Sequence, residues 1–220
     1  MDALAVQQAE LSILRRIGRS EGEILIVQVN LANTYTQVGL EQEALQMRHD
    51  VYFGRLKLLG GENHLTLVAA DNYALSLITL QRLKEAVSLM RRALPVAKRV
   101  LGASNELTIR MVRSYAWALY ADADATLDDL REAVKTLEDA ERIARRVLGG
   151  AHPVTIAIEL NLQDARAAPR ARRRACKDSN WTGTPPVGRR YKKNSSLSRA
   201  QTPPRPASGP RRATRRPSTG

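Results

Sequence analysis

Apolar residues follow a helical period over most of residues 1–168. Between residues 83 and 101, for example, apolar side chains recur three and four positions apart, from Ala86 through Leu94 to Leu101. That spacing places them on one face of a helix. No segment alternates apolar and polar residues over a useful length, so strands are not expected. The pattern predicts eight helices, at residues 2–17, 24–38, 41–58, 64–80, 83–101, 106–121, 127–148 and 153–167.

A nine-residue segment occurs three times in related form. Residues 58–66 read Leu-Leu-Gly-Gly-Glu-Asn-His-Leu-Thr, and similar segments occupy residues 100–108 and 147–155, at offsets of 42 and 47 residues. Stepping back another 42 residues from Leu59-Gly60 leads to Ile17-Gly18, the trace of a truncated earlier unit. Self-similarity at such a period is typical of stacked helical repeats.

Each copy of this segment contains the residues that end one helix and begin the next. A glycine stands where a left-handed residue would end a helix, and a polar residue follows where the next helix would be capped. The glycines are Gly60, Gly102 and Gly149, and the predicted N-caps are Asn63, Asn105 and His152. Pro153 then falls at a first helical position, where its missing N–H does no harm. Thr126 with Asp129 predicts a capping box for the helix that follows five extra residues in the third unit.

Small residues recur at fixed positions of every unit. Two columns of alanine are in register with the repeat: Ala32, Ala74 and Ala116 in one, and Ala44, Ala86 and Ala133 in the other. Short side chains at these places allow antiparallel helices to approach closely. Because one helix pair cannot bury its apolar face alone, the units must stack. We therefore predict an all-α solenoid of helix pairs that forms a right-handed superhelix and is followed by a disordered basic tail.

The net charge of +13 is concentrated in that tail. Residues 169–220 contain fifteen Lys and Arg against one acid, Asp178, whereas residues 1–168 are almost neutral. A composition of Arg, Pro, Ser and Thr favours disorder. Three interpretations remain open for it: a solvated extension without a role of its own, a nuclear targeting signal, or a weak, nonspecific, salt-dependent site for nucleic acid.

Composition also argues against several kinds of chemistry. Cys176 is the only cysteine, and three scattered histidines provide no cluster for zinc. There is no glycine-rich phosphate loop, no apolar run near the roughly 18 residues of a membrane span, and no secretory signal. We expect a protein that is not an enzyme, with no catalytic residues, metal site or cofactor, located in the cytoplasm and not in a membrane.

The repeat positions carry a family resemblance. The alanine columns, the helix pairs and Tyr35 in the segment 30–35 resemble tetratricopeptide repeats. The period of 42 residues and the pattern Leu-Gly-x-x-His-Pro-x-Thr, complete at residues 148–155, are similar to the kinesin light chain subfamily. The resemblance covers about residues 1–168. It divides them into a truncated leading helix at 1–24, repeats at 25–66, 67–108 and 109–155, and a partial repeat at 156–168, before the tail at 169–220.

This resemblance implies a function in protein–protein interaction. In tetratricopeptide scaffolds the first helix of each unit lines a concave groove, and asparagines at its sixth position bond to a peptide backbone. That position holds Asn30, Asn72, Ser114 and Asn161. An amide offers an extended chain both a donor and an acceptor. The alternative is that these asparagines are polar helix residues with local partners.

Four further residues of the third unit fall on the same helix face, beside Asp71 of the second unit: Arg110, Arg113, Trp117 and Tyr120. Two arginines three positions apart would give that end of the groove a positive field. Two aromatic rings at the same spacing would pack against an apolar side chain. The expected partner is therefore an extended peptide that carries acidic residues. The alternative for the two aromatic residues is that they are buried between repeats. A nucleic-acid-associated protein that acts through the tail is the alternative function.

Overall fold

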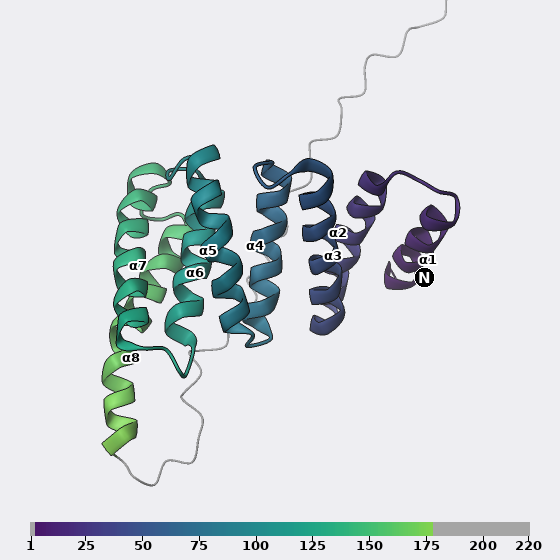
Figure 1. Cartoon of the computed structure of the whole chain (residues 1–220). Coiled ribbons are helices and arrows are strands. Elements are labelled where there is room, and N and C mark those ends of the chain that lie inside the picture. The colour runs from purple at the N-terminus through teal and green to yellow at the C-terminus, as the bar shows by residue number, and fades with distance from the viewer. Residues whose placement is uncertain (1–2, 178–220) are drawn as a thin grey trace, which may run out of the picture. The chain divides into compact units, whose positions relative to one another are not determined.

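The chain forms a row of antiparallel α-helices. The computed structural model describes residues 3–177, and describes side chains as far as residue 168. The helices of this part are α1 (Ala3–Arg16), α2 (Glu21–Gln37), α3 (Glu41–Leu59), α4 (His64–Thr79), α5 (Leu83–Val100), α6 (Glu106–Ala121), α7 (Leu127–Val147) and α8 (Pro153–Lys177). Figure 1 shows them following one another from α1 at one end to α7 and α8 at the other. The part of the chain that the structure describes contains no strand, as the hydrophobic period predicted.

The end of α8 differs from the prediction. The helix continues to Lys177, beyond the predicted end at residue 167 and beyond the change in composition after Ala168. Alanine and arginine, which dominate the sequence after residue 168, are both good helix formers. The boundary predicted between repeats and tail is therefore not the end of a structural element. The rest of the predicted tail, residues 178–220, lies outside the described residues.

The turns between repeats have the predicted geometry. The backbone φ angles are 80°, 87° and 89° at Gly60, Gly102 and Gly149. The predicted cap side chains each accept a hydrogen bond from the N–H two positions on, at 2.8 Å for Asn63, 2.9 Å for Asn105 and 3.3 Å for His152. Thr126 and Asp129 form the predicted capping box at the start of α7. Local sequence thus determines where these helices begin and end.

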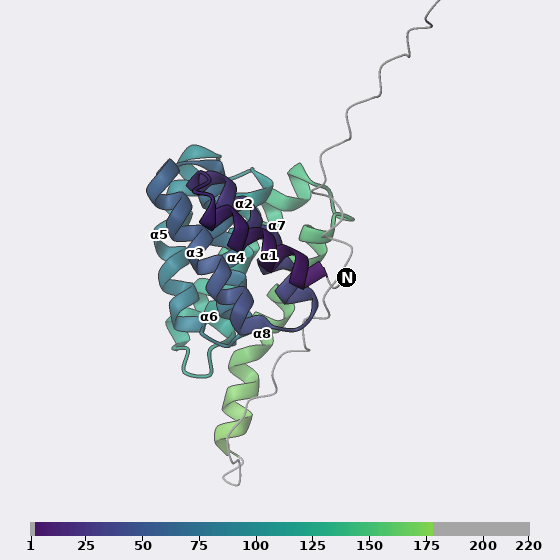
Figure 2. The same ribbon diagram turned by 90° about the vertical axis from the view of Figure 1, so that its right-hand side faces the viewer.

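The helices form two layers. We refer to α2, α4, α6 and α8 as first helices, and to α3, α5 and α7 as second helices. Each helix packs against its neighbours in the chain, and in addition α4 packs against α6 and α6 against α8. Among the described residues, no corresponding contact joins α3 to α5 or α5 to α7. From α4 to α8 the first helices therefore pack more tightly than the second helices do. Figure 2 looks along the row of helices from α1.

The core is continuous through the later repeats and divided near the N-terminus. One large cluster of buried residues extends from Leu45 on α3 to Ala165 on α8. A separate cluster holds α1 against α2, and a small third cluster consists of Leu25, Val51 and Ala69. Both alanine columns are almost completely buried, which confirms the predicted close approach of the helices.

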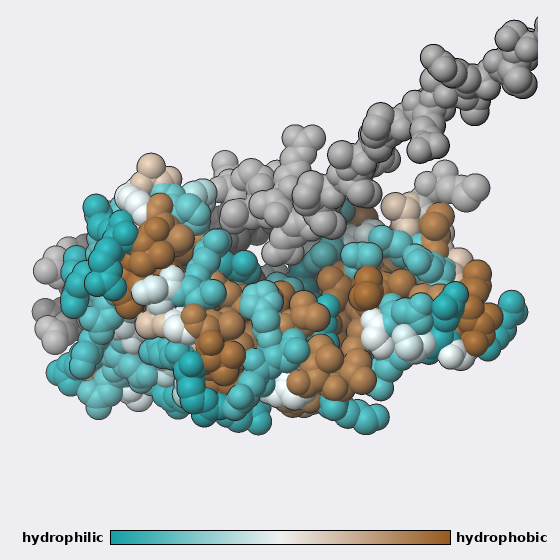
Figure 3. Space-filling view, turned by 90° about the horizontal axis from the view of Figure 1, so that it is seen from above, coloured by the Kyte–Doolittle hydropathy of each residue, from teal (hydrophilic) through white to brown (hydrophobic). Residues whose placement is uncertain are grey.

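Apolar side chains gather on the side of the stack where each second helix leads into the next first helix (Figure 3). The large exposed apolar residues at these helix ends include Ile17, Leu58, Leu59, Leu65, Val100 and Val147. Leu101 and Leu148, which directly precede the turn glycines, pack instead against the main core. The repeated Leu-Gly pair therefore combines a core contact with a turn in the later repeats, while Leu59 stays 40% exposed.

Candidate functional site

The predicted column of asparagines lies along the first helices, but its members have different surroundings. Asn30 on α2 is exposed and Asn72 on α4 is half-buried, whereas Ser114 on α6 is buried. Asn161 on α8 donates a hydrogen bond from Nδ2 to the hydroxyl of Tyr120 at 3.0 Å. Asn30 and Asn72 are therefore the two asparagines outside the contacts between first helices. The amide of Asn161 instead joins α8 to α6.

Arg110 and Arg113 are placed differently from the expected positive end of the groove. Arg110 forms an ion pair with Asp71, 2.7 Å from Nη2 to Oδ2, and the Asp71 side chain is 1% exposed. Arg113 is buried, with 8% of its surface exposed. Burial raises the pKa of the Asp71 carboxyl, and the charges of Arg110 and Arg113 oppose this shift. Residues 71 and 113 occupy equivalent positions on the adjacent first helices α4 and α6. The two arginines thus compensate the charge of a buried acid where these helices meet.

The two aromatic residues of this face have separate roles. Tyr120 is 8% exposed, and its hydroxyl accepts the bond from Asn161 between α6 and α8. Burial is the main reason that the pKa of Tyr120 is raised. Trp117 is half-buried and packs against the main core. Tyr120 is therefore buried at the α6–α8 contact, and Trp117 is the less buried of the two aromatic residues.

A cleft that the sequence interpretation did not anticipate separates α2 from α4. Although α4 packs against α6 and α6 against α8, no such contact joins α2 and α4 in the described chain. The space between them, which we call the α2–α4 cleft, is small, with room for about one water molecule. It is lined by Val29, Ala32, Asn33, Arg48, Val51, Ala69 and Asn72. One asparagine of the predicted column thus lies beside an arginine contributed by the second helix α3.

Arg48 is held in this cleft by hydroxyl groups. Its Nη1 donates to Oγ of Ser76 at 2.6 Å, and its Nη2 donates to Oγ1 of Thr36 at 3.1 Å. These bonds connect α3 to α4 and to α2. Burial lowers the pKa of Arg48, and the charge of Glu41 acts in the opposite direction. The guanidinium is therefore a fixed, partly desolvated cation.

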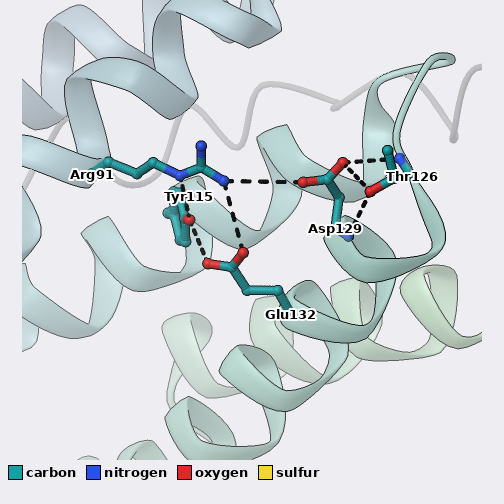
Figure 4. A network of polar contacts seen from close by, with 5 residues as sticks. All are labelled: Arg91, Tyr115, Thr126, Asp129 and Glu132. Carbon is teal, nitrogen blue, oxygen red and sulfur yellow. Dashed lines mark hydrogen bonds and ion pairs between the residues drawn. The ribbon is translucent and has the colours of Figure 1, made fainter.

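A second polar cluster joins α5, α6 and α7 (Figure 4). Arg91 donates from Nε to the hydroxyl of Tyr115 at 3.2 Å, and this hydroxyl donates to Oε1 of Glu132 at 2.5 Å. Arg91 also lies 3.8 Å from Glu132 and 4.0 Å from Asp129, whose carboxylate caps α7 with Thr126. Burial raises the pKa of the Tyr115 hydroxyl. These groups bond to one another across three helices, which is the arrangement of a structural network.

Two further findings concern the described part of the chain as a whole. Between residues 3 and 177, no three His, Cys, Asp or Glu side chains come together as a group that could hold a metal ion. None of the helices in the same range combines the length and the apolar character needed to cross a membrane.

Comparisons with known proteins agree with this architecture. Residues 23–99 match the family model of the tetratricopeptide repeat. Two similar solved structures are of a protein from Podosopora anserina, described as a kinesin light chain with nearly identical TPR-like repeats, one of them a variant with a single substitution. Each is 24% identical and covers 80% of this chain and 81% of its own, with TM-scores of 0.65 for the variant and 0.63 for the other. BtubC (BKLC) from P. vanneervenii is 15% identical, with a TM-score of 0.54 over 89% of this chain and 73% of its own. No curated protein matches the chain significantly.

The fold is therefore that of a tetratricopeptide repeat protein. Its repeats are similar in fold to those of the Podosopora anserina protein described as a kinesin light chain, in keeping with the resemblance noted in the sequence. Such a fold is a non-catalytic repeat scaffold suited to protein–protein interaction.

Proposed function

We propose that this protein is a non-enzymatic scaffold that binds an extended peptide along the inner face of its first helices. The observation that carries the proposal is the placement of Asn30 and Asn72. They occupy the same position of successive first helices, and neither is enclosed in the core. An extended peptide lying across α2 and α4 would meet one amide per repeat. Each amide can donate to a peptide carbonyl and accept from a peptide N–H, whatever the ligand's side chains.

Backbone bonds alone give a weak complex, so the ligand also needs side-chain contacts. A hydrogen bond contributes about 0.5–1.5 kcal/mol net, and several are required for useful affinity. The exposed part of Trp117 offers one apolar contact further along the inner face. The acid preference predicted from Arg110 and Arg113 requires a different cation, because Arg110 is paired with Asp71 and Arg113 is buried.

The test is selection of displayed random peptides on the 220-residue chain, followed by affinity measurements on the enriched peptides. Asn30→Ala combined with Asn72→Ala should weaken binding by roughly 5- to 150-fold, because up to two backbone bonds are lost. A matched control is Gln42→Ala, which removes an exposed amide from the second helix α3. If the folded double variant retains full affinity for every enriched peptide, the inner face is not the site.

A further inference from the structure

The helix at the N-terminal end of the row (Figure 1) has two apolar faces, and only one of them is covered. α1 packs against α2 through the face on which Leu11 is buried. Val6, Ile13 and Ile17 lie seven and four positions apart, which places them together on the other face of the helix. All three are about half exposed, and no helix precedes α1 among the described residues.

The last helix of the described chain has a similar uncovered face. α8 buries Ile158 in the main core, whereas Ile156 and Leu160, four positions apart on another face, are exposed. In the register of the repeat, Ile156 corresponds to Leu25 of α2, which is buried in one cluster with Val51 of α3 and residue 69 of α4. That position is therefore covered by the two helices that follow a first helix. Among the described residues, no helix follows α8.

These two faces belong to complementary halves of a repeat. α8 is a first helix without a second helix after it, and α1 stands before α2 where the other first helices have a second helix. Each second helix packs against the first helix on either side of it, and no such contact joins the second helices of the described chain to one another. The uncovered face of α1 therefore fits a first helix better than it fits another α1. The outer face of a terminal repeat is usually polar, because it has to stay in water.

A pair of residues inside the chain indicates how α8 would meet the start of another chain. Asp71 of α4 and Arg110 of α6 form an ion pair at 2.7 Å where these first helices pack together. In the register of the repeat, Leu160 of α8 stands at the position of Asp71, and Ile26 of α2 stands at the position of Arg110. Leu160 and Ile26 are both more than half exposed. Stacking α8 on α2 of another chain, as α4 stacks on α6, would bring these two apolar side chains together.

We propose that copies of this protein associate head to tail, with α8 of one chain packed against α1 and α2 of the next. α1 then takes the place of the second helix after α8, and α2 takes the place of the following first helix. Because each chain carries one face of each kind, the contact is heterologous and continues from chain to chain. This association uses the ends of the row of helices, and it goes beyond the peptide binding proposed for the inner face.

Sedimentation equilibrium of the 220-residue chain tests this association. A salt concentration of about 0.5 M screens the charges of residues 169–220. The mean mass of the wild type should rise with protein concentration and pass that of a dimer, because the contact does not close. Ile13→Asp and Leu160→Asp each place a charge on one of the two faces, and each should weaken association by about a hundredfold or more. The matched control is Leu127→Asp at the start of α7, since Leu127 is 56% exposed, as Leu160 is.

Two combinations of variants test the geometry of the contact. Ile13→Asp retains its α8 face and Leu160→Asp retains its α1 face, so an equimolar mixture should form dimers that grow no further. In a single chain, Ile26→Arg combined with Leu160→Asp should recover about tenfold of the lost association, because the two introduced side chains copy the ion pair of Asp71 with Arg110. Ile26→Arg alone should weaken association. Circular dichroism establishes that each variant keeps the helix content of the wild type.

Three results would overturn the proposal. The first is a wild type that remains a monomer up to about 0.5 mM. The second is association of equal strength in the wild type and both aspartate variants, which would place the contact on another surface. The third is a Leu160→Asp variant that associates as the wild type does while Ile13→Asp does not, which would mean that two α1 helices pair with each other. None of these results depends on peptide binding at the inner face.

Discussion

Gln81 and Gly39 occupy the same position in successive repeats, and both have a left-handed backbone, with φ angles of 59° and 83°. The turn is the same in the two places. The N–H of Gln81 donates to the carbonyl of Ile78 at 3.0 Å, and that of Gly39 donates to the carbonyl of Thr36 at 3.3 Å. A left-handed conformation costs a residue with a Cβ roughly 1–2 kcal/mol, and glycine adopts it without that strain.

Gln81→Gly should therefore stabilise the protein. We expect the free energy of unfolding to rise by about 0.5–1 kcal/mol. The substitution relieves the backbone strain, and the larger conformational entropy that glycine loses on folding offsets part of this gain. Urea denaturation followed by circular dichroism measures this change. The reverse substitution, Gly39→Gln, serves as the matched control and should destabilise by a similar amount. A destabilising effect of Gln81→Gly would show that the side chain of Gln81 contributes more than its backbone strain costs.

The alanine columns predict a steric limit on side-chain size. Ala86 and Ala133 are completely buried where adjacent helices meet. Replacing either by leucine should lower the free energy of unfolding by about 1–3 kcal/mol, because the added atoms have to displace a neighbouring helix. Ser88→Leu, an exposed position on the same helix as Ala86, should change it by less than about 0.5 kcal/mol. Equal effects at positions 86 and 88 would contradict the observed packing.

The buried carboxyl of Asp71 should make stability depend on pH. Burial raises its pKa above the ordinary value of 3.8. Between pH 3.8 and this raised pKa, the folded protein therefore holds more protons than the unfolded chain. The contribution of Asp71 to the free energy of unfolding therefore falls as pH rises through this window and is constant above it. Asp71→Asn cannot titrate and should lack this dependence.

The measurement is urea denaturation of the wild type and Asp71→Asn at a series of pH values upward from about 3.8. The free energy of unfolding of the wild type minus that of the variant should decrease as pH rises. Asp139→Asn, which removes a surface carboxylate, controls for the loss of a charge. A difference that increases with pH would mean that the ion pair with Arg110 outweighs the burial of Asp71.

Much of this fold could be predicted from the sequence because its signals are local and repeated. Gly60 and Asn63 determine a turn through their own backbone and side-chain preferences, and the register of the repeat then predicts the same turn at Gly102 and Gly149. The end of α8 has no such signal. Composition changes after Ala168 without a capping residue, and the helix continues to Lys177.

The candidate site could be predicted only in part, because one face of a first helix both lines the groove and packs against the next first helix. Spacing placed Arg110, Arg113 and Tyr120 on that face. It did not show that Asp71 and Asn161 of adjacent helices reach them. The α2–α4 cleft had a signal in the sequence, since Ala69 aligns with Met111. Alignment alone does not tell whether neighbouring helices move together to fill such a space or leave it open.

Arg48 and Ser76 allow the cost of the α2–α4 cleft to the stability of the fold to be measured. Arg48→Met alone leaves the buried hydroxyl of Ser76 without its partner, and Ser76→Ala alone removes a bond from the partly desolvated guanidinium. The two changes together reproduce the apolar pair of the next repeat, Met90 and Ala118, which lie 42 residues further along the chain.

We therefore expect each single variant to have the stability of the wild type or less, and the double variant to be more stable by about 1 kcal/mol or more. The coupling between the two changes should be about 0.5–3 kcal/mol in a double-mutant cycle of urea denaturation. The reverse pair, Met90→Arg with Ala118→Ser, should unfold much more readily, because Met90 is completely buried and α4 packs directly against α6. If instead the double variant is less stable than the wild type, Arg48 is a structural part of the contact between the first two repeats.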